Sequence, residues 1–304
     1  MAKNTAKDTK TDVTFPSSGM NLAGHLYAPA DRAEGDRLPA LVIGHPTTGV
    51  KEQAPASYAP RLAAAGYLVL TFDAAHQGAS EGEPRGLEDP FQRAEDFRNA
   101  VTYLTTRADA DPERIGVLGI CGSGGYVPYA AQTDHRMKAV ATVSAADVPA
   151  FFRSADPEGF RKLVEESGRA RTQEALGGPV RMVPVLPDTV DDATPASVRE
   201  FHDYYKTPRA RHSRSTGAYA LRSAGLLDQY DSYAEIHKIA PRPLLMIAGS
   251  RAETLPFSSG AVEKAGDTAE LFVVDGATHV DLYDRDEAVT PAVAKLTAFF
   301  GKHL

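Results

Sequence analysis

The chain has 304 residues, and its 33 basic and 40 acidic side chains give a formal net charge of −7. This acidic surplus excludes nucleic acid and anionic membranes as expected partners, because both are negatively charged. Hydrophobic residues make up 42% and charged residues 24%, a balance that excludes disordered, collagen-like and coiled-coil chains. The single cysteine, Cys121, excludes an intramolecular disulfide and a metal site built from several cysteines.

Residues 1–11 are polar and lysine-rich and lack the apolar core of a secretory signal, so we predict a flexible tail there. No apolar run approaches the roughly 18 residues that a membrane-spanning helix needs. We therefore expect a cytoplasmic protein. The composition does not determine the oligomeric state, and it is compatible with a homodimer.

After the tail, residues 12–15 and 21–27 predict an antiparallel hairpin, and from residue 39 short apolar runs alternate with helical patterns. This alternation is typical of the α/β class, in which crossover helices wind both faces of a mostly parallel sheet. The predicted strands are 40–44, 67–72, 114–120, 139–144, 243–248 and 270–274. The predicted helices are 58–65, 90–107, 124–132, 259–265 and 291–302.

The alternation stops between residues 148 and 237, where charged and aromatic residues recur at helical spacing. A connection of about 90 residues is far longer than an ordinary loop. We predict a helical lid, residues 148–237, inserted into a core made of residues 1–147 and 238–304.

Residues 114–126 combine an apolar strand with a cluster of small residues that opens a helix, the pattern of a nucleophile elbow. The nucleophile on such a turn needs very small neighbours, and the next amide becomes an oxyanion donor. The segment GICGS centres on Cys121, whereas the overlapping CGSGG centres on Ser123. We favour Cys121, because the apolar run ends at Ile120 and puts the cysteine at the strand tip. Ser123 stays the alternative nucleophile.

A general base is expected after the last strand, where the segment VVDGATH ends in His279. A nucleophile followed by a late histidine is the order of a hydrolase elbow fold. The carboxylate that orients the histidine is predicted to be Glu253, on the loop after strand 243–248. The alternative acid is Asp147, at the end of strand 139–144.

The loop after the first parallel strand, residues 44–49, should supply an oxyanion donor from the amide of Thr47 or Thr48. The amide of Gly122 would be the other donor. Aromatic residues of the lid could line an apolar acyl pocket: Phe151, Phe152, Phe201, Tyr204 and Tyr205.

From about Phe15 to the C-terminus, the chain resembles the α/β-hydrolase superfamily. The segments HPTTGVKEQ, FDAAHQGASEG, GICGSGG and GATHVDLY together look like its dienelactone-hydrolase-like and polyketide-transferase-like branch. The resemblance implies a doubly wound sheet, a Cys or Ser nucleophile with a histidine and a carboxylate, and no metal or organic cofactor. The chain departs from the family pattern at Ser123, where glycine is usual, and at Glu253, where aspartate is usual.

The expected function is hydrolysis of an ester, thioester or lactone of a small-molecule acyl substrate through an acyl-enzyme on Cys121. Because a partner charge and a helix N-terminus lower a thiol pKa, we expect a thiolate–imidazolium pair with His279 at neutral pH. One alternative is an acyltransferase or cyclase acting on a polyketide or carrier-bound acyl chain. The other is a ligand-binding protein without turnover.

Overall fold

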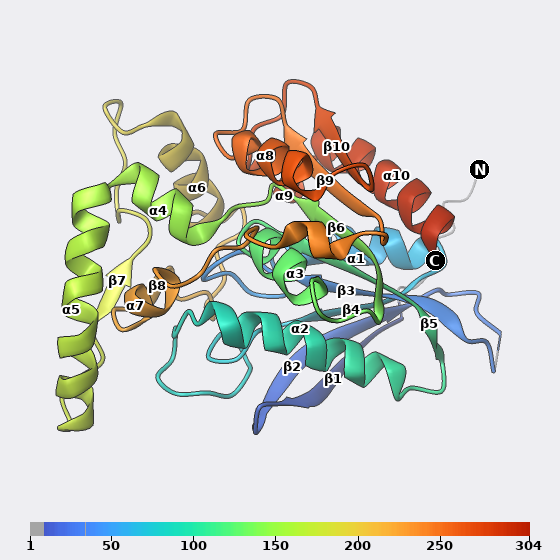
Figure 1. The fold of residues 1–304 in the computed structure, drawn as a ribbon, viewed down its shortest axis with the longest axis horizontal. Helices are drawn as coiled ribbons and strands as arrows, with labels where there is room; N and C mark the ends of the chain where they lie inside the picture. The colour runs from blue at the N-terminus through green and yellow to red at the C-terminus, as the bar shows by residue number, and fades with distance from the viewer. Residues whose placement is uncertain (1–8, 34) are drawn as a thin grey trace.

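The computed structural model describes residues 9–33 and 35–304 and contains an eight-stranded sheet with helices on both faces (Figure 1). The sheet order is β1-β2-β4-β3-β5-β6-β9-β10. The bounds are β1 (Thr9–Ser17), β2 (Met20–Ala28), β3 (Leu38–Gly44), β4 (Leu68–Phe72), β5 (Ala110–Ile120), β6 (Met137–Val143), β9 (Leu244–Gly249) and β10 (Ala269–Val274). β2 pairs antiparallel with β1 and β4, and all other neighbours are parallel. The predicted α/β class with a mostly parallel, doubly wound sheet is confirmed.

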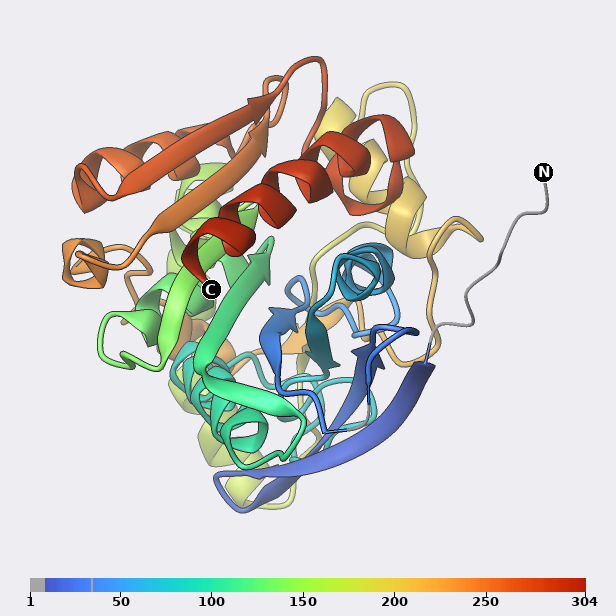
Figure 2. The same cartoon turned by 90° about the vertical axis from the view of Figure 1, so that its right-hand side faces the viewer.

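Of the predicted tail, residues 1–8 lie outside the described residues, and residues 9–11 belong to β1. The β1-β2 hairpin forms one edge of the strongly twisted sheet and β10 forms the other (Figure 2). Among the helices that the structure describes, none is both long and apolar enough to span a bilayer.

Strands in the middle of the sheet are buried on both faces, which is why their sequences are continuous apolar runs. In β4, Leu68, Leu70 and Phe72 pack into one hydrophobic cluster, whereas Val69 packs into the other. The cluster on the first face is covered by α2 (Pro90–Thr105), α3 (Ser123–Ala131) and α8 (Leu255–Ala265). The opposite face is covered by α1 (Ala54–Ala64), α9 (Asp281–Asp284) and α10 (Asp286–His303).

Most of the segment between β6 and β9 lies beyond one end of the sheet (Figure 1). Its elements are α4 (Val148–Ala155), α5 (Pro157–Ala175), β7 (Met182–Pro184), α6 (Ala196–Lys206), β8 (Ala218–Ala220), α7 (Ser223–Leu227) and the 3₁₀ helix η1 (Ile236–Ile239). β7 and β8 pair antiparallel, a small sheet that the sequence did not predict. The hydroxyl of Ser215 donates to the carbonyl of Thr48 (2.8 Å), and Gln53 donates to the carbonyl of Ala210 (2.9 Å). The insertion is thereby anchored to the loop after β3.

Candidate active site

Cys121 occupies a sharp turn between β5 and α3, with a φ of 56°. This left-handed conformation is strained for a residue with a side chain and is kept only where surrounding structure holds it. The amide of Cys121 donates to the carbonyl of Val143 (3.0 Å), and its carbonyl accepts from Gly124 (2.7 Å). The turn therefore has the geometry of a nucleophile elbow, with the cysteine at its tip.

The glycines beside Cys121 allow close approaches of the chain. A Cβ on Gly119 would lie 2.1 Å from the carbonyl oxygen of Ser123, and one on Gly122 would lie 2.1 Å from Oγ1 of Thr47. Since real Cβ atoms do not approach so closely, larger residues would force the turn apart.

We expect Gly119→Ala to destabilise the protein by about 1–3 kcal/mol, because the added methyl group collides with backbone that cannot rotate away. Activity should fall with it, since the turn carries Cys121. The matched control is Gly260→Ala on α8, where a Cβ meets nothing within 4 Å. Urea unfolding should show the control to be at least as stable as the wild type; equal stability of the two variants would contradict this account of the turn.

Ser123, the alternative nucleophile, lies beneath the turn and not at its tip. Its side chain is buried, and its hydroxyl donates to the carbonyl of His45 (2.6 Å) and accepts from Arg93 (3.3 Å). Cys121 lines the pocket described below, whereas Ser123 does not. Of the two candidates, the structure brings only Cys121 to the pocket that His279 also lines.

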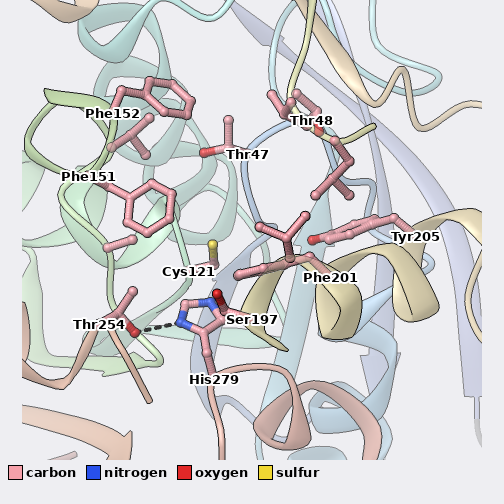
Figure 3. A pocket seen from close by; sticks show the side chains of 15 residues that line it. Thr47, Thr48, Cys121, Phe151, Phe152, Ser197, Phe201, Tyr205, Thr254 and His279 are labelled. Atoms are coloured by element: carbon pink, nitrogen blue, oxygen red, sulfur yellow. Dashed lines mark hydrogen bonds between the residues drawn. The ribbon is translucent and has the colours of Figure 1, made fainter. Parts of the chain in front are cut away.

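His279 follows β10 and lies beside Cys121 at the floor of this pocket (Figure 3). Its Nδ1 hydrogen-bonds Oγ1 of Thr254 (2.6 Å), and its Nε2 hydrogen-bonds the hydroxyl of Tyr283 (2.9 Å). Burial lowers the pKa of His279 to about 3, because the charged imidazolium is poorly solvated there. The imidazole is therefore neutral at neutral pH and able to accept a proton.

Neither predicted carboxylate hydrogen-bonds His279 in the described part of the chain. Glu253 is exposed and lines a small neighbouring cavity, while the next residue, Thr254, turns inward and holds the imidazole. Asp147 caps α4 by accepting from the amide of Ala150 (2.9 Å) and also accepts from the amide of Ser232 (3.2 Å). Here a threonine hydroxyl occupies the position at Nδ1 that was expected for an acid.

The thiol of Cys121 is surrounded by hydrogen-bond donors. Burial raises its pKa, and hydrogen bonds from the hydroxyl of Tyr283 and the amides of Gly122 and Thr47 offset part of that rise. The expected thiolate–imidazolium pair is therefore not favoured at rest; the pair is a neutral thiol and a neutral imidazole. The two amides that donate to the thiol, those of Gly122 and Thr47, are both predicted oxyanion donors. Thr48 lines the pocket but does not donate to Sγ.

Two buried side chains that the sequence analysis missed hold the loop of Thr47 in place. Burial keeps the pKa of His45 well below its usual value, so the ring is neutral. Its Nδ1 donates to the carbonyl of Pro46 (2.7 Å), and its Nε2 accepts from the amide of Ala74 (3.1 Å). The guanidinium of Arg93 donates to the carbonyl of His45 (2.9 Å). The histidine-proline pair in the sequence was the available signal for this support.

The pocket above Cys121 has a volume of about 140 Å³ and is mostly apolar. Its lining comes from the sheet loops and from the insertion: Thr47, Thr48, Cys121, Ala146, Val148, Phe151, Phe152, Val185, Leu186, Ser197, Val198, Phe201, Tyr205, Thr254 and His279. None of these described residues is charged. Most of the predicted lid aromatics line the pocket, as Figure 3 shows, but Tyr204 does not. Tyr204 packs against Tyr283 instead, because neighbouring residues on a helix point in directions about 100° apart.

Within residues 9–33 and 35–304, no group of three or more His, Cys, Asp or Glu side chains is arranged to hold a metal ion.

The sheet order, the strained elbow and the late histidine define the class of an α/β hydrolase. The sequence model of the X-Pro dipeptidyl-peptidase (S15) family matches residues 18–155. The chain is 35% identical to the uncharacterized protein YcjY of Escherichia coli K12, over 96% of this chain and 98% of that protein. It superposes on the crystal structure of hypothetical protein PA2218 from Pseudomonas aeruginosa with a TM-score of 0.92 and 36% identity, covering 99% of this chain and 95% of that one.

A further relative, the thiohydrolase aneE of Aspergillus aculeatus, is 27% identical over 84% of this chain and 81% of its own length. The chain thus belongs to the α/β-hydrolase superfamily, in the family that contains YcjY and PA2218. The predicted resemblance to the superfamily is confirmed, and the protein is an enzyme of the hydrolase or acyltransferase type.

Proposed function

We propose that the protein hydrolyses an uncharged ester or thioester through an acyl-enzyme on Cys121. The observation that carries this proposal is that Cys121 and His279 share one apolar pocket while two backbone amides converge on Sγ. These are the parts that acyl transfer requires: a nucleophile, a base and an oxyanion site.

In the first half of the reaction, the thiol loses its proton to the neutral imidazole as Sγ attacks the acyl carbonyl. The amides of Gly122 and Thr47 donate to the oxyanion of the tetrahedral intermediate. The imidazolium of His279 then protonates the leaving group, and the acyl thioester remains on Cys121. In the second half, His279 takes a proton from water, which attacks the thioester and returns the thiol.

The lining of the pocket supports an uncharged acyl group as the substrate class. Phe151, Phe152 and Phe201 offer apolar surface, and none of the described residues that line the pocket is charged and able to pair with a carboxylate or phosphate. Burying an unpaired charge is costly. The name of the relative aneE, a thiohydrolase, supports a thioester as the bond that is cleaved.

We expect a butyryl ester to react at least about tenfold faster, in kcat/KM, than the hemisuccinyl ester of the same alcohol, because the latter must bury a carboxylate.

Stopped-flow assays with nitrophenyl esters and acyl thioesters, followed by mass spectrometry of the quenched enzyme, test the proposal. The acyl mass should appear on the peptide that contains Cys121. Loss of the adduct to water, and not to an added alcohol acceptor, would distinguish hydrolysis from acyl transfer. An adduct on any other peptide, or none with any substrate, would refute the proposal.

A further inference from the structure

The hydroxyl of Tyr283 lies between the two groups that must exchange a proton. It is 2.9 Å from Nε2 of His279, and it lies close enough to Sγ of Cys121 that hydrogen bonding to the thiolate lowers the thiol pKa. The hydroxyl of Tyr205, on the insertion, hydrogen-bonds the same oxygen. The nitrogen of the base and the sulfur of the nucleophile are therefore connected through a single phenolic oxygen.

The position of this hydroxyl is well defined by packing. Tyr283 is fully buried on the short helix α9, one helical turn after His279. Its ring packs edge-on against Tyr204, with centroids 5.0 Å apart, and against His279 at 5.4 Å. The hydroxyl of Tyr58 donates to the carbonyl of Leu282 and so holds α9 against α1. The side chain has little freedom to leave the site.

The hydrogen bonds can run in one direction from sulfur to nitrogen. When Nδ1 of His279 carries its proton and donates to Thr254, Nε2 is an acceptor. The Tyr283 hydroxyl then donates to Nε2, which leaves its oxygen free to accept from the thiol of Cys121. After proton transfer every bond reverses: the imidazolium donates to the phenolic oxygen, and the phenol donates to the thiolate. In both states the sulfur, the phenol and the imidazole each have a hydrogen-bond partner.

We propose that Tyr283 is a catalytic residue that relays the proton from Sγ of Cys121 to Nε2 of His279. The inference rests on the proposed role of Cys121 as nucleophile. The S–H bond breaks and its proton forms an O–H bond on Tyr283, while the original O–H proton forms an N–H bond on His279. Sulfur keeps the electron pair for attack, and tyrosine is a neutral phenol before and after the step.

The surroundings favour such a relay over a free tyrosinate. Burial keeps the pKa of Tyr283 well above its usual value, so the phenol does not lose its proton outright. A concerted shift of two protons avoids that anion. It also leaves the thiolate with a hydrogen-bond donor in a mostly apolar pocket.

The test is Tyr283→Phe, which keeps the ring and removes the bridging oxygen. We expect kcat/KM for an ester at pH 7 to fall about 10²-fold, with KM within about threefold, because Tyr283 does not line the pocket. Alkylation of Cys121 by iodoacetamide should slow about tenfold at pH 7. Its pH profile should shift to higher pH, because the thiolate loses a donor and the thiol pKa rises.

The matched control is Tyr58→Phe, which removes a buried hydroxyl from the same helix contact without touching sulfur or imidazole. It should lower stability but leave the pH profile of alkylation unchanged. The same shift of that profile in both variants would refute the relay.

A measurement on the wild type does not depend on whether the variants fold. In mixtures of H₂O and D₂O, a two-proton relay gives a curved dependence of kcat/KM on the deuterium fraction. A straight line would overturn it.

The outcomes separate the two proposals. An acyl adduct on Cys121 together with an unaltered Tyr283→Phe variant refutes the relay and leaves the nucleophile in place. An adduct elsewhere refutes the nucleophile, and with it the relay.

Discussion

Replacing Cys121 with alanine is expected to lower turnover of an activated ester by at least about 10⁴-fold and to leave the fold intact. Of the two candidate nucleophiles, Cys121 and Ser123, only Cys121 lines the pocket. If its thiol is the proposed nucleophile, the alanine variant keeps only substrate binding and the proposed oxyanion amides. Circular dichroism should show a folded variant, since alanine fills most of the same space. Residual activity is measured with the same nitrophenyl ester as for the wild type.

The control is Ser123→Ala, which should retain activity within a few-fold of the wild type. The Ser123 hydroxyl donates to the carbonyl of His45, which also accepts from Arg93. Losing this hydrogen bond should lower the free energy of unfolding by about 1 kcal/mol, while catalysis changes little. Because Cys121 is the chain's only cysteine, one equivalent of iodoacetamide should abolish activity. An inactive Ser123→Ala variant with normal stability would transfer the nucleophile to Ser123.

The predictions of strands succeeded where the sheet buries both faces of a strand. In β4 and β9 every residue is buried, and such runs stand out in the sequence. Strand ends were harder to predict. β5 begins at Ala110 and not at 114, because Ala110 pairs with Leu38 across the sheet. A pairing partner so far along the chain cannot be read from a polar stretch such as residues 111–114.

The short strands β7 and β8 were missed for a related reason. Each is three residues long, and Val183 pairs with Tyr219 across a long intervening segment. No periodic pattern can develop over so few residues. Their formation depends on how the insertion folds back on itself, which local sequence does not specify.

The site was predictable where the fold itself fixes the direction of a side chain. A strand that ends at Ile120 and turns into a helix exposes the next residue, Cys121. Loop residues lack such a rule, and Glu253 and Thr254 illustrate this: they are neighbours, but only the threonine turns toward His279. Tyr283 could have been predicted as a neighbour of His279 from the sequence. It lies four residues after His279, and side chains four residues apart on a helical turn lie on the same side of the helix.

His279→Gln should lower kcat/KM at pH 7 by about 10³-fold, within the range for a lost general base. Glutamine approximates the size of the imidazole but has no basic nitrogen. The deficit should narrow toward pH 10, where hydroxide removes the proton of the Cys121 thiol directly. The control is His135→Gln at an exposed position, which should match the wild type at every pH. A constant deficit across the pH range would argue that the imidazole acts by packing alone.

The wild-type pH profile follows from the same burial. An imidazole of ordinary pKa, about 6.5, would lose about 30-fold of its neutral form at pH 5, and kcat/KM would fall with it. Because burial lowers the pKa of His279 to about 3, we expect kcat/KM to stay nearly constant from pH 7 to pH 5. The unfolded chain binds a proton at this histidine below about pH 6.5 and the folded chain does not, so stability falls as the pH drops. Activity at pH 5 must therefore be measured while circular dichroism confirms that the protein is folded. If kcat/KM of the folded protein instead falls with a midpoint near pH 6.5, then His279 is solvated, and the resting state is not a neutral thiol beside a neutral imidazole.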